Sequence, residues 1–100
     1  MNLEKFEETI MYKFKNKNLL KTALTHTSYA YENKVHSNER LEFLGDAVLE
    51  LTVSKYLFEN KKNLSEGEMT KVRAAVVCEK TLNKIAIMHN FGDFLLLRKK

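Results

Sequence analysis

The sequence contains no proline, only three glycines and a single cysteine among its 100 residues. With so few residues that interrupt helices, the chain can run as successive helices joined by short polar turns. One cysteine excludes an internal disulfide framework, and the place of Cys78 in the AAVVC run predicts a small buried side chain. No apolar run approaches the roughly 20 residues that span a bilayer, and the N-terminus lacks the apolar core of a secretory signal. These absences favour a cytoplasmic protein that does not enter a membrane.

Charge of one sign is only slightly in excess. Lysine and arginine total 17 against 13 acidic residues, which gives a net charge of +4 and an isoelectric point near 9.2. This excess permits a polyanionic partner without requiring one, and short basic runs are most often solvated faces. The length suits one small domain.

Apolar residues recur at helical spacing along most of the chain, which predicts an all-α fold. Asn18 is the expected cap of the second helix, residues 25–37 are expected to form a loop, and Ser37 or Asn38 is expected to begin a helix reaching about Asn60. The motif S-x-x-E at Ser65 predicts a capping box for the next helix. Gly92 is expected to end the last one. The apolar residues at helical spacing within 3–10, 19–24, 41–51, 69–76 and 82–89 are expected to form the buried stripes of the helices.

The segment NERLEFLGDAVLEL places four acids on one face of its helix. If Glu39 defines the zero angle of a helical wheel, then Glu42, Asp46 and Glu50 fall at about −60°, −20° and +20°. This pattern is typical of a solvated face. However, like charges three or four residues apart cost roughly 0.2–0.5 kcal/mol per pair, and Gly45 within the helix costs about 0.5–1 kcal/mol relative to alanine. The combination therefore also suits a carboxylate site for a hard cation such as Mg²⁺.

Phe43 falls at about +40° on the same wheel, beside the acidic residues and away from the leucines. An exposed aromatic side chain on a polar face is compatible with a partner subunit.

The segment NERLEFLGDAVLE resembles the signature of the ribonuclease III family. YKFKNKNLLKTALTHTSY resembles the opening helix pair of that family, SEGEMTKVRAAVVCEKTL the segment after the signature helix, and FGDFLLL the next stretch of the family pattern. Nearly the whole chain aligns in order.

The resemblance implies an all-helical nuclease domain that dimerises and cleaves double-stranded RNA during rRNA and mRNA processing. It implies Mg²⁺ as cofactor, for which Mn²⁺ can substitute, and products with 5′-phosphate and 3′-hydroxyl ends. Recognition of the duplex would be largely through backbone and 2′-hydroxyl contacts.

By position, Glu42 and Asp46 match the metal-binding, catalytic carboxylates of the family. Glu39 and Glu66 match supporting acids, and Phe43 matches an aromatic residue of the dimer interface. Glu68 is expected to be the capping-box partner of Ser65, Glu50 a solvated residue, and His26 of the LTH turn a buried structural histidine.

The sequence departs from the family pattern after the FGDFLLL segment. The family completes its metal site with a D-x-x-E pair further along, and bacterial members add a double-stranded-RNA-binding domain. Neither is found in residues 1–100, which are therefore expected to be the N-terminal portion of a nuclease domain, truncated before its last helices and weak or inactive in cleavage. The DFLLLRKK end is expected to lack an element to pack against. A non-catalytic module for dimerisation or RNA binding is the alternative, and a purely structural helical adaptor is a third.

Overall fold

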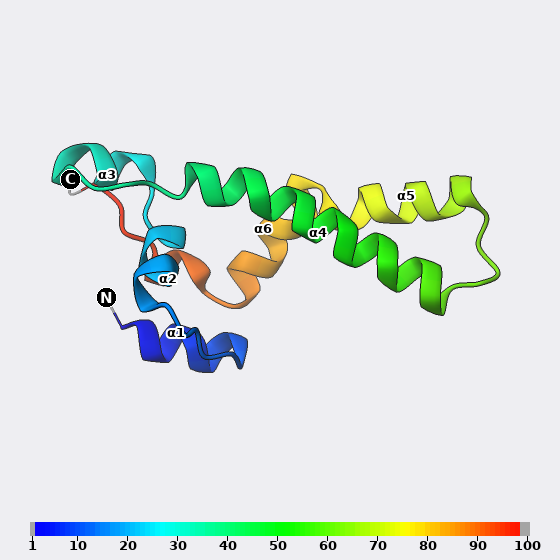
Figure 1. Ribbon diagram of the computed structural model, residues 1–100, viewed down its shortest axis with the longest axis horizontal. Coiled ribbons are helices and arrows are strands. Elements are labelled where there is room, and N and C mark those ends of the chain that lie inside the picture. Colours follow the sequence, from blue (N-terminus) through cyan, green and yellow to red (C-terminus); the bar gives the residue numbers. More distant parts are fainter. Residues whose placement is uncertain (1, 99–100) are drawn as a thin grey trace. The chain divides into compact units, whose positions relative to one another are not determined.

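The computed structural model describes residues 2–98 of the chain. Helices account for its regular structure (Figure 1), and within the described part only an isolated bridge joins Thr25 to Leu96 in place of a sheet. The all-α prediction is confirmed. The elements in chain order are α1 Leu3–Ile10, α2 Lys17–Ala23, α3 Thr27–Asn33, α4 Glu39–Asn60, α5 Glu66–Val77, α6 Glu79–Met88 and the 3₁₀ helix η1 Phe91–Phe94.

The chain divides into two compact units, one made of residues 1–42 and 86–100 and the other of residues 43–85. The first unit has an aromatic core around Phe6, Leu20 and Leu24, all buried. The ring of Phe6 packs against Phe91 at a centroid distance of 5.4 Å and against Phe94 at 5.3 Å. These contacts fix η1 on α1.

The apolar segment after η1 is also held in place, contrary to the expectation that it would find no partner. The N–H of Leu96 donates to the carbonyl of Leu24 at 2.9 Å, and the N–H of His26 donates to the carbonyl of Leu96 at 3.0 Å. The segment therefore pairs with the turn between α2 and α3. Lys99 and Lys100 lie outside the described residues.

A buried carboxylate fixes the turn between α1 and α2. Glu7, only 3% exposed, accepts hydrogen bonds from the N–H of Phe14 at 2.6 Å and from Lys17 Nζ at 2.6 and 2.8 Å. The Lys17 contact, followed by the Phe14 N–H, lowers the pKa of this carboxyl. Because the paired and hydrogen-bonded charge is satisfied, it can lie beside the core.

Three expectations about where helices begin and end were wrong in this unit. The cap of α2 is Asn16, whose side chain accepts from the N–H of Leu19, and Asn18 lies inside the helix. Residues 27–33, expected to be loop, form α3, because His26 caps the N-terminus with its own side chain. Gly92 lies in η1; the chain instead turns at Asn90, which has a φ of 56°.

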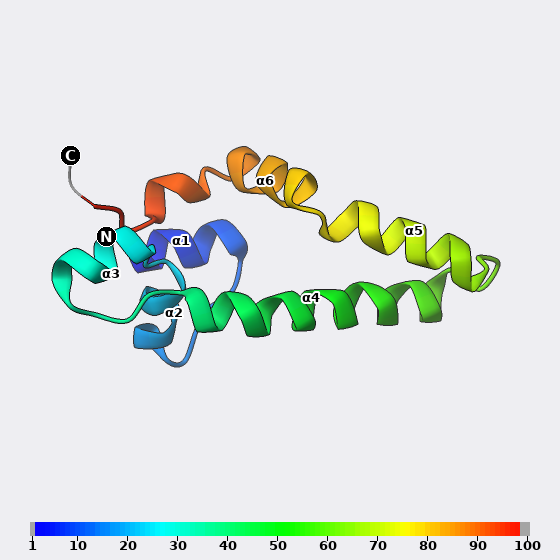
Figure 2. The ribbon, with the colours of Figure 1, turned by 90° about the horizontal axis from the view of Figure 1, so that it is seen from above.

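The second unit contains most of α4 together with α5, and Figure 2 shows α4 as one unbroken helix. The predicted capping box is confirmed: Ser65 Oγ accepts from the N–H of Glu68 at 3.2 Å, and the Glu68 carboxylate accepts from the N–H of Ser65 at 3.0 Å. Arg73 Nη1 donates to Ser54 Oγ at 2.9 Å and joins α5 to α4.

Several residues expected to be buried are exposed. Leu44, Val48 and Leu51 of α4 are 59%, 54% and 68% exposed, because pairing with one helix covers only one face of α4, at Leu57. The stripes of α5 and α6 are likewise only partly covered, with Val72 37% and Ile85 42% exposed.

Cys78 is also exposed rather than buried, because it lies in an extended conformation at the end of α5, outside either helix. Among residues 2–98, no helix has both the length and the apolar character needed to cross a bilayer.

Candidate metal centre

Helix α4 begins where the sequence predicted. Ser37 Oγ accepts from the N–H of Glu39 at 3.3 Å, and the N–H of Glu42 donates to the carbonyl of Asn38 at 2.8 Å. Glu39 and Glu42 lie in the first turn. The positive end of the helix dipole stabilises negative charge there, which offsets part of the repulsion between the acids.

Glu42 and Asp46 are exposed and lie four residues apart on this unbroken helix. That spacing places them on one face, about 6 Å apart along the helix axis. Within residues 2–98 neither carboxylate takes part in an ion pair, since the pairs present join Lys17 to Glu7 and Lys55 to Glu59. Their oxygens are therefore available to a cation from solvent.

The chemistry of these donors fits Mg²⁺. Hard carboxylate oxygens are its preferred protein ligands, and it commonly binds through one or two carboxylates while keeping several waters. In the described part of the chain, however, no group of three or more His, Cys, Asp or Glu side chains is gathered as a metal site. Glu42 and Asp46 would thus supply two ligands, leaving the other positions to water, to a substrate phosphate or to other groups.

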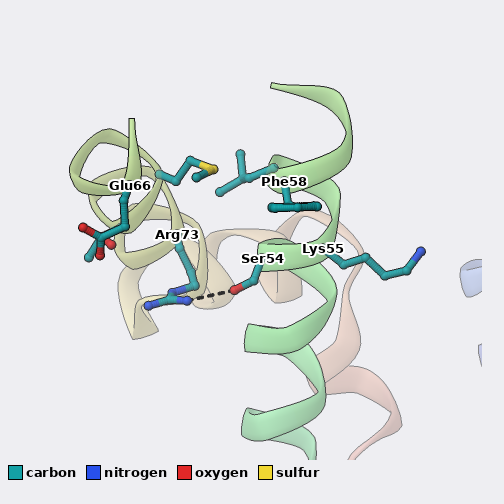
Figure 3. A pocket seen from close by; sticks show the side chains of 8 residues that line it. Ser54, Lys55, Phe58, Glu66 and Arg73 are labelled. Carbon is teal, nitrogen blue, oxygen red and sulfur yellow. Dashed lines mark hydrogen bonds between the residues drawn. The ribbon is translucent and has the colours of Figure 1, made fainter. Parts of the chain in front are cut away.

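The remaining acids have separate settings. Glu39 and Glu50 are exposed on α4, so the acidic face of the helix exists as expected. Glu66 is the first residue of α5, and Figure 3 shows its carboxylate directed away from Phe58. Glu68 is held by Ser65, whose N–H and then hydroxyl lower the pKa of this carboxyl. Glu68 is thus a capping residue, whereas the supporting roles of Glu39 and Glu66 stay predictions.

Phe43 and Gly45 lie between the two carboxylates on α4. Phe43 is 82% exposed, which agrees with its unusual place on the helical wheel. A Cβ atom added to Gly45 would meet no atom within 4 Å. No close packing within the described chain therefore requires this glycine, and contacts among residues 2–98 do not account for its cost in the helix.

A cavity of about 380 Å³, which the sequence did not predict, lies between α4 and α5. Leu57, Phe58 and Met69 form its apolar wall, and the hydrogen bond from Arg73 to Ser54 crosses one side (Figure 3). Figure 3 also shows Lys55 extending away from this wall. The available signal was Arg73 itself, a charged residue inside the apolar run of α5.

His26 was expected to be buried and is exposed instead. Its Nδ1 accepts from the N–H of Ser28 at 3.1 Å and lies 2.8 Å from Ser28 Oγ, which in turn accepts from the N–H of Arg98 at 3.0 Å. His26 is therefore a structural cap of α3 and is not part of the acidic face.

Comparison with known proteins places the chain in a family. A family profile described as Ribonuclease-III-like matches residues 16–100. Ribonuclease 3 of Oceanobacillus iheyensis is 53% identical over 102 residues, covering 99% of this chain and 45% of that protein. Ribonuclease 3 of Clostridium perfringens is 53% identical over 100 residues, covering 99% of this chain and 42% of that protein. The chain thus spans less than half the length of these curated relatives.

The fold is also similar to solved structures. Two structures of the nuclease domain of ribonuclease III from Campylobacter jejuni match with TM-scores of 0.86 and 0.84 at 53% identity. Both matches cover 96% of this chain, and they cover 65% and 63% of those chains. The first of these structures concerns flexibility in a region involved in dimer formation of that nuclease domain. From the profile, the relatives and the shared fold together, the chain belongs to the ribonuclease III-like family.

Proposed function

We propose that these 100 residues form part of the nuclease domain of a Mg²⁺-dependent endoribonuclease that cleaves double-stranded RNA. The observation that carries the proposal is the exposed, unpaired couple Glu42 and Asp46 on the first turns of α4, in a chain of the ribonuclease III-like family. The proposed products carry 5′-phosphate and 3′-hydroxyl ends, and the proposed setting is rRNA and mRNA processing in the cytoplasm.

In this proposal Glu42 and Asp46 would hold the ion, and Mn²⁺ could replace Mg²⁺. When bound, the metal supplies an activated water and neutralises charge that develops on the phosphoryl oxygens. Glu39, one turn before Glu42, would add negative potential that favours cation entry. Glu66 lies beside Phe58, about 18 Å along α4 from Asp46, so its supporting role rests on its match to the family pattern alone.

The RNA duplex is proposed to be recognised by its backbone. A-form RNA hides its base edges in a deep and narrow groove, so contacts to phosphates and 2′-hydroxyls dominate. The net charge of +4 is compatible with such a polyanion.

A homodimer is the proposed assembly. Phe43 is 82% exposed, and Leu44, Val48 and Leu51 are exposed as well. An apolar surface of this kind on α4 is typical of a site of protein–protein interaction. The region of dimer formation in the Campylobacter jejuni nuclease domain supports this part of the proposal.

Cleavage is best tested in a chimera, because the chain spans only part of its relatives. Residues 1–100 would replace the matching segment of the Oceanobacillus iheyensis ribonuclease 3. With long duplex RNA and Mg²⁺, we expect cleavage by the chimera, loss of cleavage in Glu42→Gln and Asp46→Asn, and retention in the matched control Glu50→Gln. Cleavage that survives both site substitutions would contradict the proposal.

The 100-residue chain alone is expected to cleave slowly or not at all, because two carboxylates supply few of the ligands of an octahedral ion. Rapid conversion of long duplex RNA to short duplexes by this chain would contradict that expectation.

A non-catalytic module for dimerisation or RNA binding is the second candidate. It is favoured by one observation, the lack of a group of three or more potential ligands within residues 2–98. A chimera that binds duplex RNA but does not cleave it, with or without Asp46→Asn, would favour this module over the nuclease.

A further inference from the structure

A second cavity, of about 400 Å³, lies between α2 and α3 in the first unit and has a basic wall. Its polar lining comes from α2, from α3 and from the links beside them, and it includes Asn18, Lys21, Thr22, Tyr29, Lys34 and His36. No carboxylate lines it.

The two lysines of this basic cavity are available to an external anion. Lys21 and Lys34 are exposed, and neither forms an ion pair with a carboxylate in the part of the chain that the structure describes. Two ammonium groups around one hollow surface raise the local positive potential, and the low-dielectric wall strengthens it. The hydroxyls of Thr22 and Tyr29 and the amide of Asn18 add neutral donors.

The ends of α2 and α3 border the basic cavity, and exposed carbonyls there would repel an anion. Those carbonyls already have partners. Thr25 Oγ1 donates to the carbonyl of Lys21 at 2.6 Å, and Asn38 Nδ2 donates to that of Ala23 at 3.3 Å. At the end of α3, the N–H of Val35 donates to the carbonyl of Ala30 at 3.1 Å. The negative ends of both helices are thus partly neutralised from within the fold.

The backbone of Lys34 allows its side chain to be tested separately from the fold. It ends α3 in the left-handed conformation, with φ 53° and ψ 46°, where glycine or asparagine is the usual residue. A side chain with a Cβ costs roughly 1–2 kcal/mol in that conformation. Glycine would form this turn more easily, so the Lys34 side chain can be removed without loss of the fold.

We propose that this basic cavity binds the phosphodiester backbone of RNA, with Lys21 and Lys34 on phosphate oxygens and the hydroxyls and amide near ribose 2′-hydroxyls. The identity of the anion rests on the proposed function. The surface is built from residues 18–36 and is separate from the carboxylates of α4. Lysines on phosphates with neutral donors on the sugar are the usual means by which proteins hold a nucleic-acid backbone without reading its sequence.

The test is duplex RNA binding by the 100-residue chain in EDTA, measured by fluorescence anisotropy at several salt concentrations. The variants are Lys21→Ala, Lys34→Gly and their double, and the control is Lys61→Ala combined with Lys62→Ala, which removes two exposed charges elsewhere. Lys34→Gly relieves the left-handed strain, so a melting temperature equal to or above that of the unchanged chain shows that the fold is intact. We expect the double variant to bind about tenfold more weakly and to lower the slope of log K against log salt by about 2.

Equal affinities for this double variant and the Lys61→Ala, Lys62→Ala control would overturn the inference. The proposed nuclease function would still stand, since it is tested separately by Asp46→Asn. Binding of duplex DNA as tight as that of duplex RNA would overturn the assignment to RNA. Titration with inorganic phosphate, followed by NMR, is the last control. If millimolar phosphate shifts the Lys21 and Lys34 amide signals while the duplex does not, the cavity binds small anions and the inference is wrong.

Discussion

Glu7 and Lys17 are joined across the turn between α1 and α2, with the Lys17 ammonium nitrogen 2.6 Å from Glu7 Oε2. The glutamate is nearly inaccessible to solvent, whereas the side chain of Lys17 is half exposed. The same carboxylate also receives the N–H of Phe14. One side chain therefore fixes both the helix that carries Phe6 and the turn after that helix.

The stability of the chain should depend on this contact in a pH-dependent way. The pKa of Glu7 is lowered from its ordinary value of 4.5, first by Lys17 and then by the Phe14 N–H. A lowered pKa in the folded state contributes stability above the unfolded pKa and loses it as the pH falls through the folded pKa. Glu7→Gln should therefore be less stable than the unchanged chain at pH 7, with a gap that closes on acidification below the ordinary pKa of 4.5.

Urea denaturation from neutral to acidic pH measures that gap. Glu4→Gln, an exposed acid on the same helix, is the matched control and should give a nearly constant difference. A gap for Glu7→Gln that does not change with pH would contradict the assignment.

The capping box of α5 predicts a local loss of stability. Ser65→Ala removes the acceptor for the N–H of Glu68 and should cost about 1 kcal/mol, within the usual range of roughly 0.5–2 kcal/mol. Thr70→Ala on the same helix should cost much less. Thermal unfolding followed by circular dichroism compares the two, and equal losses would show that the cap contributes little.

A substitution at Gly45 can distinguish an effect on helix stability from an effect on partner binding. Because a Cβ there meets no atom within 4 Å, Gly45→Ala should stabilise the helix by about 0.5–1 kcal/mol. If another molecule approaches α4 closely at this point, the same change should weaken dimerisation or RNA cleavage in the chimera. Denaturation and sedimentation velocity measure the two effects, and a stabilised variant with unchanged assembly and cleavage would show that no partner needs the glycine.

Cys78 should react readily with thiol reagents. Its Sγ lies 3.3 Å from Thr81 Oγ1, and hydrogen bonding with the side chain and then the backbone of Thr81 lowers the pKa of the thiol. A lowered pKa increases the thiolate fraction near neutral pH. Thr81→Ala should therefore slow alkylation by iodoacetamide at pH 7 and shift the pH midpoint of the reaction upward. An unchanged pH profile would contradict the role of Thr81.

Local signals in the sequence predicted much of the helical structure. The capping box at Ser65, the start of α4 and the stripe of α1 all depend on residues within a few positions of one another, so the pattern alone contains the information. The start of α3 was missed because the cap is a histidine, His26, whose side chain accepts the hydrogen bond that Ser, Thr, Asn or Asp usually accepts at this position.

Burial was harder to predict, because it depends on partners that are distant in sequence. Leu44, Val48 and Leu51 have the spacing of a core stripe, yet the hairpin with α5 leaves them exposed. The contact of Phe91 and Phe94 with Phe6 joins opposite ends of the chain and leaves no local pattern. For the acidic face, spacing predicted that Glu42 and Asp46 share one side of a helix. Further ligands of the proposed metal site would lie far from them in sequence, and spacing within one helix carries no information about them.

The most direct test of the metal proposal is the effect of Mn²⁺ on the backbone amide signals of the ¹⁵N-labelled chain. We expect selective paramagnetic broadening around residues 42–46 of α4, abolished in the Glu42→Gln, Asp46→Asn double variant and retained in Glu50→Gln. Broadening centred elsewhere, or unchanged in the double variant, would contradict the claim that these two carboxylates hold the ion.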